Sequence, residues 1–305
     1  MHGVTRALTD ALSYLLFRNR FALAAKLALP LAVIVALFAA PLVFLLRVSF
    51  WEYTPTGLVP AFSARNYVYF LSTPVYRATM LQSIELALLV SLVCLVLGYP
   101  LALILTRVRM KYGFVLVFVL ITPLFVSVVV RTFGWLVLLE RQGLVNAALM
   151  SLGLIDRPLV LVNNMLGVSL GLVNVALVFM VIPIVAALAG VPRSLNEAAQ
   201  TLGANRFSAW WYVTWPLSAP GVLAGFILVF AITLSAFVQP RILGGAAFFV
   251  IPIQIWRQVS GVLNWPLGAA MGFSLLCVSF AISYAAYSLY RYAFPDVARP
   301  VERQR

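Results

Sequence analysis

Long uncharged apolar runs recur along the chain, and short segments between them carry the charges. There are 20 uncharged residues between Lys26 and Arg47, and 21 between Glu85 and Arg107. A helix needs about 20 apolar residues to cross the hydrocarbon core of a bilayer, since each residue rises about 1.5 Å along the axis. Each of these runs therefore predicts one membrane-spanning helix.

The later apolar runs are longer than one span, and each contains Gly, Pro, Asn or Trp-Pro at one end. We interpret each as a single helix with an attached loop. The predicted fold is therefore an all-α integral membrane protein with six spans, at roughly 27–46, 80–106, 114–139, 165–189, 218–238 and 268–290. A closed β-barrel is excluded, because its strands would alternate apolar and polar residues over short segments.

The charges predict how these spans are oriented. Six spans place both termini on one side of the membrane, and that side holds 13 Lys and Arg residues against 8 on the other. Lys and Arg are enriched in cytoplasmic loops, so both termini should be cytoplasmic. The predicted organisation is a cytoplasmic segment 1–26, a transmembrane domain 27–292 and a cytoplasmic tail 293–305.

The composition agrees with a chain solvated mostly by lipid. The chain is 64% hydrophobic and 10% charged, with a mean hydropathy of +1.04. Its net charge of +13 could suggest a nucleic acid partner, but the basic residues are dispersed over short loops and do not form one stripe. Anionic lipid headgroups explain the charge more simply, so we expect lipid and not nucleic acid as a partner.

The residue types needed for catalysis or metal binding are sparse. Cys94 and Cys277 both fall inside predicted helices, and the only histidine is His2. We find neither a metal-ligand spacing nor a Cys/His nucleophile arrangement. Only Glu85 and Arg131 are ionisable at membrane depth, which leaves no acid/base pair. We therefore expect no catalytic, cofactor or metal site, and no enzyme activity.

The connection between the fourth and fifth spans, residues 190–221, has a helical pattern of its own. Ser194 and Glu197 form an S-x-x-E capping box, and Gly203 suits a left-handed C-terminal cap. Asn205 can cap a second helix that ends before Pro216. The pattern alone fits an ordinary interfacial connector equally well.

The residues in this connection carry a resemblance. Glu197-Ala198-Ala199, followed by Gly203 and then by Trp215-Pro216-Leu217, resembles the EAA signature of ABC importer permeases. In that family the loop, here 190–216, forms a coupling helix that fits a groove on a cytoplasmic ATPase. The resemblance implies that the ATPase-docking residues are Ser194, Glu197, Ala198, Ala199, Leu202 and Gly203.

Further segments extend the resemblance over roughly Asn66 to Leu276, within a core of about 66–290, and are most similar to permeases of spermidine and putrescine importers. They include the segments 130–135, 143–146, 220–225 and 264–270. The resemblance implies a type I importer permease of the bacterial inner membrane, transporting a polyamine or a similar small cation. It also implies as partners a second permease subunit, two ATPase subunits and a periplasmic solute-binding protein.

ATP hydrolysis is expected on another polypeptide. The chain contains no G-x-x-x-x-G-K-[ST] phosphate loop, so ATP and Mg²⁺ should bind to the partner ATPase. An ion-driven secondary transporter or channel is the main alternative, and would usually show intramembrane acids at the midplane. Glu85 is the one hint of that. A structural scaffold would leave the 190–221 connection unexplained.

Candidate pathway residues follow from charge and aromaticity. Glu85 and Arg131 are predicted at similar depth near the periplasmic side, where they could form an ion pair. We favour such a structural pair over direct substrate contact. Aromatic faces and carboxylates bind ammonium groups. The candidates for the pathway or its gate are Glu85, Tyr99, Arg131, Trp135, Phe237 and Gln239.

Overall fold

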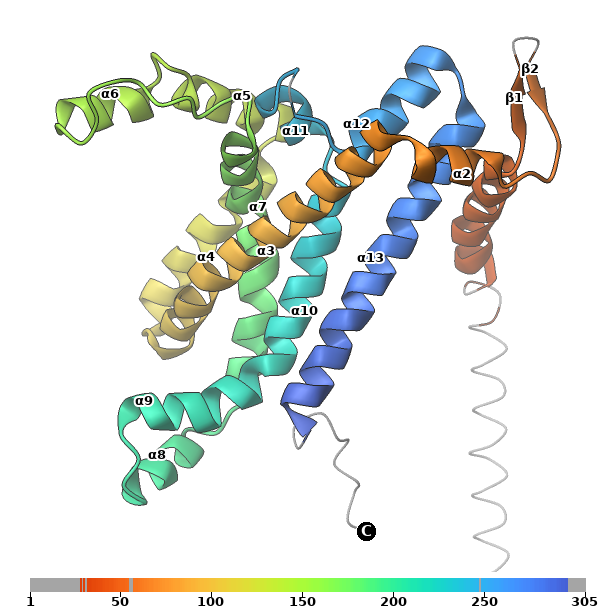
Figure 1. Ribbon diagram of the computed structural model, residues 1–305. Helices are drawn as coiled ribbons and strands as arrows, with labels where there is room; N and C mark the ends of the chain where they lie inside the picture. Colours follow the sequence, from red (N-terminus) through yellow and green to blue (C-terminus); the bar gives the residue numbers. More distant parts are fainter. Residues whose placement is uncertain (1–27, 29, 31, 55–56, 247, 296–305) are drawn as a thin grey trace, which may run out of the picture.

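The computed structural model describes residues 28, 30, 32–54, 57–246 and 248–295 (Figure 1). The predicted N-terminal segment 1–26 lies outside the described residues, as do residues 296–305 of the predicted tail. After a first helix over Ala32–Ser49, the elements are β1 (Glu52–Thr54), β2 (Gly57–Val59), α2 (Arg65–Ser72), α3 (Pro74–Arg107), α4 (Met110–Phe125), α5 (Val128–Leu139), α6 (Leu144–Ser151), α7 (Met165–Ala189), α8 (Arg193–Thr201), α9 (Arg206–Ala209), the π-helix η1 (Trp210–Thr214), α10 (Trp215–Leu234), α11 (Val238–Leu243), α12 (Ile251–Trp256), the π-helix η2 (Arg257–Val262) and α13 (Trp265–Ala293).

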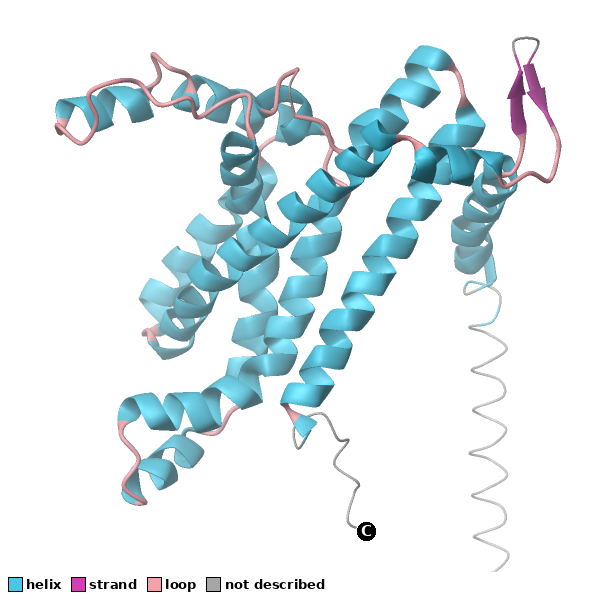
Figure 2. Cartoon of the chain, viewed as in Figure 1, coloured by secondary structure: helices cyan, strands magenta, loops and turns pink. Residues whose placement is uncertain are grey.

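The prediction of an all-α membrane protein is confirmed. Within the described residues, five helices are long and apolar enough to cross a membrane, and a bent pair makes a sixth span if it is counted as one. The five are Ala32–Ser49, Pro74–Arg107, Met165–Ala189, Arg206–Leu234 and Trp265–Ala293. A single two-stranded antiparallel hairpin, β1–β2, interrupts the helical pattern and was not anticipated (Figure 2).

The span predicted over 114–139 is not one continuous helix. Helix α4 ends at Phe125, and the helical segment that begins at Val128 is bent by 102° relative to it. Pro123 lies in the last turn of α4, and Val126 has extended backbone angles. A proline inside a helix removes a backbone donor and disturbs the preceding turn, which favours a break here.

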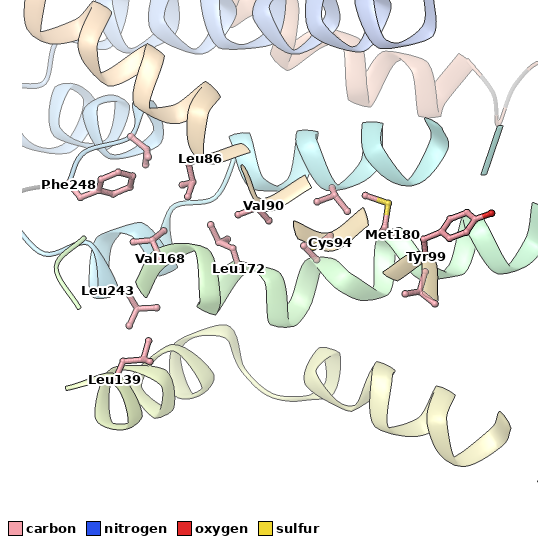
Figure 3. Close-up of a cluster of buried hydrophobic side chains, with 14 of the residues drawn as sticks. Leu86, Val90, Cys94, Tyr99, Leu139, Val168, Leu172, Met180, Leu243 and Phe248 are labelled. Carbon is pink, nitrogen blue, oxygen red and sulfur yellow. The ribbon is translucent and has the colours of Figure 1, made fainter. Parts of the chain in front are cut away.

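Three helices, α3, α7 and α10, form the core of the bundle. Figure 3 shows the α3–α7 part of this core, where Val90 and Cys94 of α3 face Leu172 and Met180 of α7. The sequence of α10 allows close approach, because a Cβ atom on Gly221 would lie 2.5 Å from the backbone oxygen of Pro183. The three helices therefore contact each other with little space between their backbones.

The connections gather at the two ends of this bundle (Figure 1). The α8–α9 hairpin, the α3–α4 turn and the end of α13 lie at one end. The helices α5, α6, α11 and the β-hairpin lie at the other end. The 190–221 connection is thereby separated from the helices that carry Arg131 and Gln239.

Candidate coupling site and pathway residues

The helix that carries the EAA residues, α8, projects from the end of the bundle together with α9 (Figure 1). It begins at Arg193, and the last residue with extended backbone before it is Pro192. Ser194 is therefore the second helical residue, and among the described residues no side chain caps this helix. The predicted capping box between Ser194 and Glu197 is wrong, and the carboxylate of Glu197 is exposed instead.

The end of α8 agrees with the prediction. Gly203 has a φ of +94°, and its N–H donates to the carbonyl of Gln200 at 3.0 Å. The N–H of Ala204 donates to the carbonyl of Ala199 at 3.0 Å. These two bonds form a Schellman motif, in which a glycine takes the left-handed position because it has no Cβ. The turn after α8 is therefore fixed by Gly203.

The predicted docking residues lie mostly on the free surface of α8. Leu202, at the tip, is 89% exposed, and Ala199 is half-buried. The remaining four are exposed: Ser194, Glu197, Ala198 and Gly203. The helix thus presents small side chains, one carboxylate and one leucine to a partner. Docking of an ATPase on this surface stays a prediction.

The start of the second helix is as predicted, but its end is not. The side-chain oxygen of Asn205 accepts the N–H of Ser208 at 2.7 Å, so Asn205 is the N-cap. The helical backbone then continues from Arg206 to Leu234 without ending before Pro216. Pro216 lies in the first turn of α10, where a missing N–H is tolerated.

The π-helix η1 joins α9 to α10. The N–H of Trp215 donates to the carbonyl of Trp210, five residues earlier. Such π segments are rare and often mark functional sites. The chain therefore passes directly from the projecting hairpin into a core helix of the bundle.

One side-chain hydrogen bond ties α8 to this segment. Thr214 Oγ1 donates to Asn196 Oδ1 at 3.0 Å, and Thr214 is 4% exposed. The sequence reasoning missed both residues, because they lie 18 positions apart and Thr214 sits inside a mainly apolar run. We find no local sequence signal that would have paired them.

Tyr99 belongs to an aromatic cluster at the end of the bundle that carries α8. Its ring centroid lies 5.0 Å from that of Trp215 and 5.9 Å from that of Trp210. Figure 3 shows Tyr99 at the opposite end of the core from Leu139 and Phe248. The structure therefore does not bring Tyr99 to the other predicted pathway residues.

The predicted ion pair between Glu85 and Arg131 is not found among the described residues. Glu85 is exposed on α3, while Nη1 of Arg131 donates to the carbonyl of Pro123 and, at 3.4 Å, to that of Val126. These carbonyls belong to the end of α4, where the helix can no longer supply donors. Arg131 thus holds the corner between α4 and α5.

The three remaining candidates lie on α5, on α11 or directly before α11. Trp135 on α5 is half-buried against the core, and Gln239 on α11 is 8% exposed. Helices α5 and α11 contact each other. Phe237, just before α11, has its ring centroid 6.1 Å from that of Trp256. A pathway role for any of these residues stays a prediction.

Comparisons with known proteins agree with this architecture. The family model of the binding-protein-dependent transport system inner membrane component matches residues 94–299. The spermidine/putrescine transport system permease protein PotB of Escherichia coli K12 is 35% identical over 217 residues, which is 71% of this chain and 78% of that protein. PotB of Haemophilus influenzae is 30% identical over 217 residues, which is 71% of this chain and 76% of that protein.

A solved structure shares the fold. It is a chain of a bacterial alginate ABC transporter in complex with an alginate pentasaccharide-bound periplasmic protein, with a TM-score of 0.74 and 20% sequence identity. The match covers 90% of this chain and 96% of that chain. None of these three relatives is described as an ion-driven transporter or channel.

Proposed function

This chain belongs to the family of binding-protein-dependent transport system inner membrane components, and from that membership we propose that it carries a polyamine across the membrane and receives its energy through α8. It is the permease of an ABC importer, a multi-pass membrane component and not a catalytic enzyme. The proposal concerns the site of coupling, the partner subunits and the substrate of this permease.

The surface of α8 is the observation that supports the coupling proposal most directly. This helix projects beyond the bundle, and Glu197, Ala198 and Leu202 are all exposed on it. A short helix with small side chains and one exposed carboxylate suits insertion into a groove of another protein, since small residues allow close approach. The Schellman turn at Gly203 keeps this surface in one orientation.

Two ATPase subunits and a second permease complete the proposed assembly, and ATP and Mg²⁺ bind to the ATPases. The chain lacks a phosphate-binding loop of the G-x-x-x-x-G-K-[ST] type, which supports the placement of ATP binding on the ATPase subunits. The family depends on a binding protein for its substrate, and the alginate transporter was solved with a periplasmic protein. The binding protein would deliver its ligand at the end of the bundle opposite α8.

The distribution of charge supports the proposed orientation. In the proposed orientation, the side of the α8–α9 hairpin holds 13 Lys and Arg residues, those of the two terminal segments included, against 8 on the other side. Lys and Arg near the ends of spans favour the cytoplasmic side. We therefore place α8, and with it both termini, in the cytoplasm.

The substrate proposal rests on the two PotB relatives, whose name specifies spermidine and putrescine. In this chain, aromatic side chains at the end opposite α8 supply faces to which an ammonium group can bind, including Trp135 and the Phe237–Trp256 pair. Arg241 lies over the ring of Trp256, with its guanidinium carbon 5.4 Å from the centroid. A polyamine would have to displace that cation to use the same face.

Alternating access is the mechanism we propose. Closure of the ATPase dimer on ATP moves α8, and the bundle helices attached to it reorient the pathway. This is coupling only if the two states of the membrane domain hold α8 differently, because a contact that is the same in both states transmits nothing.

One experiment tests the coupling site and the substrate separately. The variant Glu197→Arg is compared with wild type for co-purification of the ATPase and for uptake of radiolabelled putrescine into proteoliposomes. Glu140→Arg is the matched control, since Glu140 is also exposed but lies at the end of α5. We expect Glu197→Arg to weaken ATPase association by about tenfold or more, equivalent to about 1.4 kcal/mol.

The outcomes separate the two claims. Normal association and uptake in Glu197→Arg would remove α8 as the docking helix. Association without any putrescine uptake by wild type would overturn the substrate proposal and leave the coupling site standing. Uptake that spermidine inhibits in wild type and in the control would support the polyamine assignment.

A further inference from the structure

The α8 helix touches the rest of the molecule through very few side chains. Of its side chains that the structure describes, only Asn196 and Ala199 are half-buried, and the others are exposed. Asn196 makes the side-chain hydrogen bond to Thr214 at 3.0 Å. A displacement of α8 therefore has few routes into the bundle besides the backbone at its two ends.

Open space lies on both sides of this hydrogen bond. A cleft of about 690 Å³ separates α8 and α9 from the end of α3, and a second cavity of about 480 Å³ separates α8 from the ends of α3 and α7. Both are lined by Leu103, Arg107, Asn196 and Thr214. The bond between Asn196 and Thr214 thus lies where open space separates α8 from the ends of α3 and α7.

Thr214 is firmly attached to the core on its other side. It is 4% exposed, it ends η1, and α10 begins at the next residue. One turn further on, Ser218 hydrogen-bonds the hydroxyl of Tyr99 on α3 at 2.9 Å. Gly221 then lies directly against α7. Close-packed interiors transmit displacement, so movement at Thr214 is passed to α10 and from there to α3 and α7.

We propose that Asn196 and Thr214 are positioning residues for coupling, and that their hydrogen bond transmits the movement of α8 to α10. The proposal rests on the proposed function, in which α8 is the docking helix of the ATPase. The flanking cavities allow α8 to shift relative to α3 and α7, while this bond makes α8 and α10 move together. Without the bond, α8 can still bind the ATPase but moves without carrying α10 along.

The variant Thr214→Val tests this directly, because valine keeps the shape of threonine and lacks the hydroxyl. Asn196 lines both cavities, so a water molecule can replace the lost hydroxyl donor and the hairpin is expected to fold. Thr214→Ser restores a hydroxyl at the same place. Thr201→Val is the matched control, since Thr201 is exposed on α8 and its hydroxyl bonds only the carbonyl of Glu197.

Each variant is assembled with the ATPase, the second permease and the binding protein in proteoliposomes, and three quantities are measured: ATPase co-purification, ATP hydrolysis stimulated by the binding protein, and putrescine uptake per ATP hydrolysed. Energetic coupling between sites commonly corresponds to about 5- to 150-fold effects. We expect Thr214→Val to retain the ATPase and hydrolyse ATP while uptake per ATP falls at least about fivefold. Thr214→Ser and Thr201→Val should behave like wild type.

Other results would overturn the proposal. If Thr214→Val moves as much putrescine per ATP as wild type, the bond does not transmit movement. If Thr214→Val loses the ATPase together with uptake, the bond merely holds α8 in place. If the wild-type chain itself retains no ATPase, the proposed function fails first, and that result is distinguishable because it precedes any comparison of variants.

A double variant gives an independent measure. Asn196→Ala combined with Thr214→Val should reduce uptake per ATP no more than either single change, because both remove the same bond. Additive losses would mean that the two residues act separately, which would contradict a shared transmitting contact.

Discussion

The hydroxyl groups of Tyr99 and Ser218 lie 2.9 Å apart in the interior of the bundle, although 119 residues separate them in the sequence. Ser218 Oγ also donates to the carbonyl of Trp215 at 3.0 Å, which leaves Tyr99 as the donor between the two side chains. The pair links α3 to α10 beside the aromatic cluster. This gives Tyr99 a packing role at the α8 end of the molecule.

Replacing Tyr99 by phenylalanine should therefore affect stability more than transport. Tyr99→Phe removes one buried hydrogen bond while Ser218 keeps its bond to Trp215, so we expect a loss of about 0.5–1.5 kcal/mol in the free energy of unfolding. Equilibrium unfolding in mixed micelles measures this loss. Uptake that collapses while the free energy of unfolding is unchanged would instead place Tyr99 in the substrate pathway.

Arg131 should be needed to keep the corner between α4 and α5. Arg131→Met leaves the carbonyls of Pro123 and Val126 without this donor, and we expect a loss of about 1–3 kcal/mol in the free energy of unfolding. Amide hydrogen exchange around 126–131 should become faster. Arg131→Lys retains a donor and should be less affected.

The matched control for this prediction is Arg141→Met, since Arg141 is exposed at the start of the connection to α6. In Arg141→Met, the amide hydrogens around 126–131 should exchange at the wild-type rate. Unchanged exchange in Arg131→Met with abolished uptake would show that Arg131 acts on the substrate and not on the corner.

Gly221 should not tolerate a side chain. In Gly221→Ala, the new Cβ would lie 2.5 Å from the backbone oxygen of Pro183 and 2.6 Å from the Cβ of Ala187, so α10 and α7 must move apart. Overpacking of this kind costs about 1–3 kcal/mol. Thermal unfolding of the purified protein should show the loss, whereas Gly134→Ala on α5, where a Cβ meets open space, should match wild type. Equal melting temperatures of the two variants would refute the close contact between α10 and α7.

Asn146 should anchor α6 to the segment that follows it. Its side-chain nitrogen donates to the carbonyls of Glu140 and Leu159, and its oxygen accepts the N–H of Leu159. Asn146→Ala removes three partly buried bonds, for which we expect a loss of about 1.5–4.5 kcal/mol in the free energy of unfolding, at about 0.5–1.5 kcal/mol each. Trypsin should then cleave faster after Arg141, which is exposed and lies next to Glu140.

Ser151→Ala is the control for Asn146, because the Ser151 hydroxyl bonds only within its own helix, to the carbonyl of Ala148. Its rate of cleavage should equal that of wild type. If Asn146→Ala is cleaved no faster than this control, Asn146 does not anchor α6 to the segment that follows it.

Local signals in the sequence predicted those features that depend on neighbouring residues. The span predicted at 165–189 coincides with α7, because the length of an apolar run in lipid is a property of the run itself. The cap at Asn205 and the turn at Gly203 were also predicted, since each is made within a few residues. The predicted capping box failed for a local reason too. The residue that precedes the helix is Pro192, whereas the prediction placed Ser194 at that position.

Hydropathy could not predict the break in the third span. The run over 114–139 is apolar on both sides of the corner, and Pro123 alone does not specify a bend of 102°. The guanidinium of Arg131 must also reach the carbonyls at the end of α4, which depends on how the two helices lie in space. The same limit applies to the expected Glu85–Arg131 pair. The two residues were predicted at similar depth in the membrane, but depth alone does not specify whether two side chains face each other.

By itself, the sequence determined that this protein is a helical membrane permease of a known importer family, and that residues 190–221 contain one helix ended by Gly203 and a second one capped by Asn205. Apolar length, short-range capping and ordered motifs carry that information along the chain. Only the tertiary structure decided that Thr214 bonds Asn196, that Tyr99 lies far from the other pathway candidates, and that Arg131 closes a corner. These contacts join segments whose distance is set by the packing of whole helices, and no local pattern records that distance.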